Sequence, residues 1–210
     1  MTGICKLWSA GEGCTNVIDS KFQFVNQSAN NRTMHVIADA DLVFKKDLMG
    51  DIGDDAFIYK YGAAAVEIQG ENAINGTTFL QEGRLRVAND KGLTNNVSFA
   101  GGTLEVVSNK SVKVGMLTLA SRTLPSTASG GRIVLQPTAS LEFTDIGTFA
   151  EGARLTIEGD LSDNVLKMPP LGAGRRRAIR LQTEDGLKRV DQDEDGYLHK
   201  SYGGTMIMFR

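Results

Sequence analysis

A short phrase recurs along the chain: one or two small residues, usually glycine, followed by alternating apolar and polar residues. It reads GGTLEVV at 101–107, and again GRLRV at 83–87, GRIVL at 131–135, ASLEF at 139–143 and ARLTI at 153–157. Successive side chains of a β-strand point to opposite faces, so each phrase predicts a short strand with one apolar face and one wet face. The spacing varies, with copies starting at 83, 102, 115 (GMLTL), 131, 139 and 153.

The residues between these phrases also favour an all-β fold. The chain has 24 glycines and only 4 prolines, and many glycines stand directly before strand-like runs, where a turn needs positive φ. No window of a dozen residues carries the apolar stripe of an amphipathic helix. Two architectures fit this pattern equally well: a β-sandwich connected by hairpins, and a β-solenoid in which each strand stacks on an earlier one.

Charge and hydropathy argue against two classes of partner. The chain has 23 basic and 25 acidic residues, a formal net charge of -2, so no global field attracts nucleic acid or an anionic membrane surface. The run Arg175–Arg177 is too short for a nucleic-acid patch without interleaved aromatic residues. No stretch approaches 18 consecutive apolar residues, so we expect no membrane insertion of this segment.

One long stretch resembles a known repeat. Residues 60–106 read KYGAAAVEIQGENAINGTTFLQEGRLRVANDKGLTNNVSFAGGTLEV. They resemble the autotransporter-associated β-strand repeat, whose phrase runs Lys-x-Gly-x-Gly-x-Leu-x-Leu-x-Gly, then Asn-x-Tyr-x-Gly-x-Thr, Gly-x-Leu-x-Val and Gly-Gly-Thr-Leu. Matching positions are Lys60, Gly62, Gly70, Asn72, Gly76, Thr77, Thr78, Gly83, Leu85, Val87, Asn89, Gly101, Gly102, Thr103 and Leu104. The chain departs from the phrase at Ala64 and Ile74.

The resemblance decides between the two architectures. It implies a right-handed parallel β-helix, a β-solenoid, in a bacterial protein that is secreted or displayed on the cell surface. The repeat carries no catalytic residues, so no catalytic site and no cofactor are expected. We predict that strands between 64 and 158 stack in parallel and bury ten side chains: Leu85, Val87, Leu104, Val106, Ile133, Leu135, Leu141, Phe143, Leu155 and Ile157.

Four segments follow from this interpretation. Residues 1–30 are expected to form an N-terminal cap with the first strands, and residues 31–168 the β-solenoid, with the repeat at 60–106. Residues 169–175 read as a linker, and 176–210 as an antiparallel β-meander that caps the other end. Other domains of a longer chain and a surface polysaccharide are the expected partners; the oligomeric state is left open.

The two cysteines flank a short loop near the N-terminus. Cys5 and Cys14 enclose KLWSAGEG, and a bridge across so short a loop contributes about 2 to 3 kcal/mol where it forms. Given an exported protein, we predict a disulfide over two reduced thiols. A metal site is disfavoured by the absence of a nearby histidine.

The segment DQDEDG is the best metal candidate. Asp191, Asp193 and Asp195 stand at the alternate positions that open an EF-hand calcium loop. The twelfth position, however, is Tyr202 rather than an acidic residue. We therefore predict a hairpin turn that binds calcium weakly or not at all, with Asp195 and Gly196 at its centre and 188–191 paired antiparallel with 197–200.

These observations favour a structural or adhesive module without catalysis of its own. The alternative is a β-helix that binds or cleaves polysaccharide, for which Asp51, Asp54 and Asp55 are acidic candidates. An enzyme of that kind would need Asp or Glu and Lys, Arg or Tyr converging on one sheet face. His35 is expected to face solvent on a strand, and with His199 it forms no recognisable triad.

Overall fold

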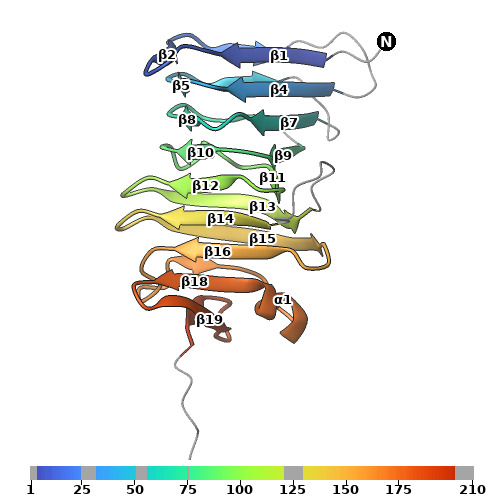
Figure 1. The fold of residues 1–210 in the computed structure, drawn as a ribbon, viewed down its shortest axis with the longest axis vertical. Coiled ribbons are helices and arrows are strands. Elements are labelled where there is room, and N and C mark those ends of the chain that lie inside the picture. Colours follow the sequence, from blue (N-terminus) through green and yellow to red (C-terminus); the bar gives the residue numbers. More distant parts are fainter. Residues whose placement is uncertain (1–3, 25–31, 51–55, 75, 121–129, 202–210) are drawn as a thin grey trace, which may run out of the picture.

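The fold consists almost wholly of strands stacked across one long axis (Figure 1). The structure, a computed structural model, describes residues 4–24, 32–50, 56–74, 76–120 and 130–201. Within these ranges a single short helix, α1 (Ala173–Ala178), lies near the C-terminal end and contains the arginine run. None of the described helical structure is long and apolar enough to cross a bilayer.

The strands form two long sheets and one small one. The first sheet contains, in spatial order, β1 (Ile4–Ser9), β4 (Arg32–Ala38), β7 (Ala56–Tyr61), β9 (Thr77–Leu80), β11 (Asn96–Phe99), β13 (Ser111–Leu119), β15 (Ser140–Phe149) and β17 (Leu166–Lys167). The second sheet contains β2 (Thr15–Ile18), β5 (Asp41–Phe44), β8 (Ala65–Ile68), β10 (Arg84–Val87), β12 (Thr103–Val106), β14 (Gly130–Leu135), β16 (Arg154–Glu158), β18 (Ile179–Thr183), β19 (Gly186–Gln192) and β20 (Leu198–Lys200). The small sheet pairs β3 (Phe22–Phe24) with β6 (Leu48–Gly50).

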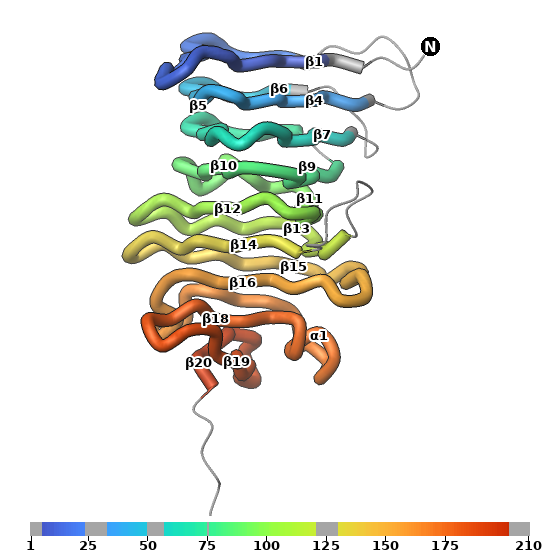
Figure 2. The backbone as a smooth tube through the Cα atoms, viewed as in Figure 1, coloured from blue at the N-terminus to red at the C-terminus, as the bar shows by residue number. Residues whose placement is uncertain are grey.

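The chain passes from one long sheet to the other and back. We call each first-sheet strand, together with the second-sheet strand that follows it, a rung. Strands of successive rungs pair in parallel throughout the first sheet, and in the second sheet as far as β18. This pairing excludes the hairpin-connected sandwich and is compatible with a β-helix. The tube in Figure 2 shows the rungs following one another from the N-terminal to the C-terminal end.

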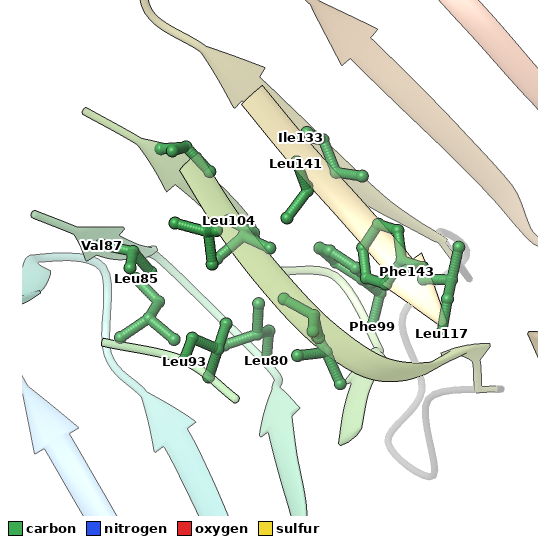
Figure 3. Packing of buried hydrophobic residues seen from close by; sticks show 14 of the residues in the cluster. Leu80, Leu85, Val87, Leu93, Phe99, Leu104, Leu117, Ile133, Leu141 and Phe143 are labelled. Carbon is green, nitrogen blue, oxygen red and sulfur yellow. The ribbon is translucent and has the colours of Figure 1, made fainter. Parts of the chain in front are cut away.

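The core lies between the two long sheets. All ten side chains that the repeated phrase placed inside are buried, at 5% exposure or less. In the second sheet the register stacks them in columns: Leu85 pairs with Leu104, which pairs with Ile133. Leu141 and Phe143 belong to β15, so the repeated phrase serves both sheets, and Figure 3 shows them facing the same interior. Each fully buried side chain of this size contributes about 1.5 to 3 kcal/mol.

Glycine is required where the chain turns from the first sheet to the second. Gly62 and Gly83 occupy this corner in successive rungs, with φ of +79° and +61°. A Cβ on Gly83 would lie 2.3 Å from the carbonyl oxygen of Gly62, closer than real contacts allow. The close stacking of these corners therefore depends on the absence of a side chain.

The two ends differ. At the N-terminal end, β1, β2 and β3 are the outermost strands of their sheets, so described residues 4–24 continue the stack. At the C-terminal end β19 pairs antiparallel with β18, and β20 pairs antiparallel with β19. An antiparallel meander therefore covers the last parallel strand of the second sheet.

Candidate functional site

The outer face of the second sheet carries a network of opposite charges. Glu105 of β12 accepts a hydrogen bond from Arg84 Nη1 at 2.8 Å, and Arg86 Nε lies 3.5 Å from the same carboxylate. Gln136 Nε2 also donates to Glu105. On its other side, Arg86 Nη1 donates to Glu67 of β8 at 2.6 Å. The charges of three successive rungs are thus joined along the stacking direction.

Glu105 is the buried centre of this network. Only 3% of the residue is exposed, because the two arginines and the glutamine cover it. Such a buried carboxylate depends on its partners, since removing one leaves an uncompensated charge. The guanidinium of Arg84 stays half-exposed and keeps donors directed to solvent.

A shallow depression of about 510 Å³ includes part of the network. Arg84, Arg86, Glu105 and Gln136 form one part of its lining, and Asp41 with Ala63–Ala65 forms the rest. The small side chains make this part of the face low, while the neighbouring rung carries long arginines. Asp41 is held in place because its Oδ1 accepts the backbone N–H of Ala65 at 2.9 Å.

The first sheet presents an aromatic face on its outer side. The ring of His35 on β4 stacks on Tyr59 and Tyr61 of β7, with centroids 5.2 and 5.5 Å apart. Tyr59 stacks in turn on Phe79 of β9 at 4.6 Å. Parallel pairing places these residues in register, so their rings lie over one another from rung to rung.

The aromatic face shifts the pKa values of its titratable members. Burial lowers the pKa of His35, and the positive charge of Lys6 lowers it further. Burial raises the pKa of Tyr61, with a smaller contribution from Tyr59. His35 does lie on the outer side of a strand, as expected, but it is half-buried because it stacks on two rings.

Trp8 stands on the same outer face, one rung beyond His35. It is 68% exposed, and its Nε1 donates to Asp39 Oδ2 at 2.8 Å. In the register of the sheet, Trp8 pairs with Ile37, which pairs with Tyr61. Asp39, at the corner between the two sheets, thus fixes the orientation of the exposed Trp8 ring.

Lys60 is a charged residue inside the molecule. It alternates with Tyr59 and Tyr61 on β7, so its side chain points inward, and it is 2% exposed. Its ammonium donates to the carbonyl oxygens of Tyr61 (2.8 Å), Gly62 (2.7 Å) and Glu82 (3.1 Å). Burial lowers its pKa to about 8, while nearby carboxylates, Glu82 first, act in the opposite direction. Lys60 therefore connects the corner at Gly62 with the next corner, at Glu82.

The segment DQDEDG forms a hairpin turn between β19 and β20, as predicted, but its loop and register differ from the prediction. Gly196 has positive φ (+92°), as expected. However, its N–H donates to the carbonyl of Asp193 at 3.2 Å, and the N–H of Asp193 donates to Tyr197 O at 3.1 Å. This is a three-residue loop closed by a left-handed glycine. The predicted register was therefore wrong by two residues: Val190, rather than Lys188, lies opposite Lys200.

The side chain of Asp193 is occupied within the turn itself. Asp193 Oδ1 accepts the N–H of Tyr197 at 2.8 Å, which favours the longer loop, and Oδ2 lies 2.8 Å from Nε2 of His199. The hydrogen bond from His199 is the main cause that lowers the pKa of Asp193. Asp191 lies opposite His199 in the ladder, and Asp195 lies within the loop. Among the described residues, no group of three or more His, Cys, Asp or Glu is placed to share a metal ion.

Other sequence candidates lie apart from these faces or outside the described ranges. Cys14 is exposed, and its Sγ lies 3.6 Å from the carbonyl oxygen of Glu12. The side chain of Cys5 lies outside the described side chains, so the disulfide stays a prediction. Residues 51–55, with their three aspartates, also fall outside the described residues.

The sequence did not reveal the two outer faces. Arg84, Arg86 and Glu105 were placed on a wet face, but their convergence depends on which rungs become neighbours. That convergence is the feature required of a carbohydrate-active β-helix, although its carboxylates are engaged by arginines. The aromatic face likewise depends on register, and the alternation in AFIYKY is the signal that could have placed Lys60 inside and its tyrosines outside.

Comparison with known proteins gives no relative on which to base an assignment. No family model, no curated protein and no solved structure matches the chain.

Proposed function

We propose that this chain is a rigid structural or adhesive module of a secreted or surface-displayed bacterial protein, built as a right-handed parallel β-helix. The observation that carries the proposal is the in-register parallel stacking of rungs. The columns from Leu85 through Leu104 to Ile133 bury apolar surface continuously along the long axis. An array of this kind holds its ends at a fixed separation, which suits a spacer.

The connections support the proposed right-handed winding. As far as β18, the second-sheet strands reach their parallel neighbours by crossovers through the first sheet, and crossovers between parallel strands of one sheet are right-handed in about 98% of cases. The resemblance of 60–106 to the autotransporter-associated repeat supports the same winding and export to the cell surface. A structural role also agrees with the paired state of Glu105 and the engaged state of Lys60.

Cellular location tests the function directly. Intact cells of the native bacterium are labelled with a membrane-impermeant amine reagent and then fractionated. We expect labelled chain on the cells or in the medium, with a cytosolic marker protein as the unlabelled control. Recovery of the chain only in the unlabelled cytosolic fraction would overturn the proposal. An experimental structure with left-handed winding would overturn the fold part alone.

A further inference from the structure

Trp8 is an exposed aromatic residue that the structural role does not explain. A tryptophan side chain is largely buried on average, yet 68% of Trp8 is exposed. Its position is nevertheless defined, because β1 fixes its backbone and Asp39 holds the indole N–H at 2.8 Å. Because the ring is already held, ligand binding would remove little further conformational freedom from it.

The depression on the second sheet is connected to Trp8 through the segment 39–41, since Asp39 bonds the indole and Asp41 belongs to the lining. The N–H of Ala64 donates to the carbonyl of Ala38, which directly precedes Asp39. Asp41 of the same rung holds Ala65 through its carboxylate. The segment 39–41 therefore lies one rung from the alanines. Asp39 in this segment holds Trp8, and Asp41 lines the depression.

The surface combines apolar and polar parts in a way that suits a sugar. The indole and the alanines offer flat apolar contacts. Asp41 offers carboxylate acceptors, while the half-exposed Arg84 offers guanidinium donors in the lining of the depression. Pyranose rings have apolar C–H faces and a rim of hydroxyl groups that both donate and accept, so each part of this surface has a counterpart on the ligand.

The charges favour a neutral ligand over an acidic one. Arg84 and Arg86 both face Glu105, and Arg86 also faces Glu67, so the guanidinium charges are balanced within the network. Asp41 and Asp39 add negative charge on the Trp8 side. Among the described residues that line the depression, together with Asp39, the carboxylates outnumber the guanidinium groups, which disfavours an acidic polymer.

We propose that the corner formed by Trp8, Asp39, Asp41, Ala63–Ala65 and Arg84 binds a neutral polysaccharide. The indole packs on a sugar ring, and Asp41 and Arg84 bind hydroxyl groups of the units that lie over the alanines. The site goes beyond the structural role and does not depend on export, so cell fractionation and binding measurements can fail independently.

The chain's single tryptophan makes the test direct, because indole emission reports only on Trp8. The full chain is titrated with soluble β-glucan, xylan, galactomannan and dextran, and with polygalacturonate as the acidic comparison. We expect a saturable change in emission with at least one neutral polymer. Calorimetry on the same polymer should then show at least tenfold weaker binding for Trp8→Ala and Arg84→Ala.

Matched variants separate this site from the rest of the surface. Arg132→Ala removes an arginine from the same face, paired with Glu158 at 2.9 Å and outside the depression. Leu187→Ala removes another exposed apolar side chain, 55% exposed, on β19. Both should bind within twofold of the wild type. Ala63→Gln, at an exposed position, should block the depression and weaken binding even if Arg84→Ala fails to fold.

Three results with the polymer panel and the site variants would overturn the proposal. They are no binding to any neutral polymer of the panel, binding to polygalacturonate alone, and neutral-polymer binding that survives both Trp8→Ala and Ala63→Gln. Equal weakening by Arg132→Ala or Leu187→Ala would also overturn it, because binding would then not be confined to this corner.

Discussion

Replacement of Lys60 by methionine should change how the stability of the protein depends on pH. Lys60 is 2% exposed, and burial lowers its pKa from 10.5 to about 8. Between these two values the folded chain has released the proton and the unfolded chain still holds it. Stability therefore rises with pH in this window, because the unfolded state binds more protons.

The size of the effect follows from the two pKa values. Below pH 7 the lysine is protonated in both states, and its burial cost is fully present. Integrating the proton difference from pH 7 to pH 10 gives a gain of about 2 to 3 kcal/mol for the wild type. Lys60→Met lacks this group, so the free energy of unfolding of the wild type minus that of the variant should rise by about 2 to 3 kcal/mol over this range.

Urea denaturation at pH 7, 8, 9 and 10 measures this difference. Other groups titrate in both proteins and cancel in the subtraction, including Tyr61, whose raised pKa reduces stability only near and above pH 10. Lys45→Met, with an exposed side chain 3.6 Å from Asp19, controls for the removal of a surface lysine. A difference for Lys60→Met that stays flat or falls between pH 7 and pH 10 would refute the reasoning.

Three further predictions concern the corner, the charge network and the acidic turn. Gly83→Ala should lower the free energy of unfolding by about 2 to 4 kcal/mol, because its Cβ meets a backbone oxygen at 2.3 Å. Gly152→Ala, which also has positive φ but open space around it, should cost only about 1 kcal/mol, and equal losses in denaturant titrations would contradict the argument. Glu105→Gln should lower the free energy of unfolding by about 3 kcal/mol, and Glu158→Gln, at a more exposed carboxylate, by less than about 1 kcal/mol. A smaller loss at 105 than at 158 would be inconsistent with a buried network. Calcium titration should give no saturable heat in the micromolar range; micromolar binding that Asp193→Ala abolishes would show a cation site at the turn.

The strands and their inward faces were predictable because they are encoded locally. Leu85 and Val87 alternate with Arg84 and Arg86, and that period of two determines which side chains share a face whatever the strand pairs with. The pairing itself is not encoded locally. ASLEF reads like GRLRV, yet its strand β15 joins the first sheet and β10 the second.

The candidate sites were less predictable because they arise from register and from side-chain contacts. Tyr59 and His35 lie 24 residues apart in the sequence, and only the pairing of β4 with β7 stacks their rings. At the acidic turn, an Asp-Gly pair signals a hairpin but leaves the loop length open. The carboxylate of Asp193, by accepting the N–H of Tyr197, favours the longer loop.

The charge network on the second sheet also disfavours misfolded arrangements of the strands. The apolar patterns of β10 and β12 are nearly interchangeable, so hydrophobic burial alone would let β8 pair with β12 and omit β10. In the native order Arg86 lies between Glu67 and Glu105 and opposes both. Omission of β10 would place the two glutamates opposite each other with no cation between them, and like charges in that position are destabilising. The alternating charges of Glu67, Arg86 and Glu105 therefore favour the native strand order, which the hydrophobic repeat alone does not determine.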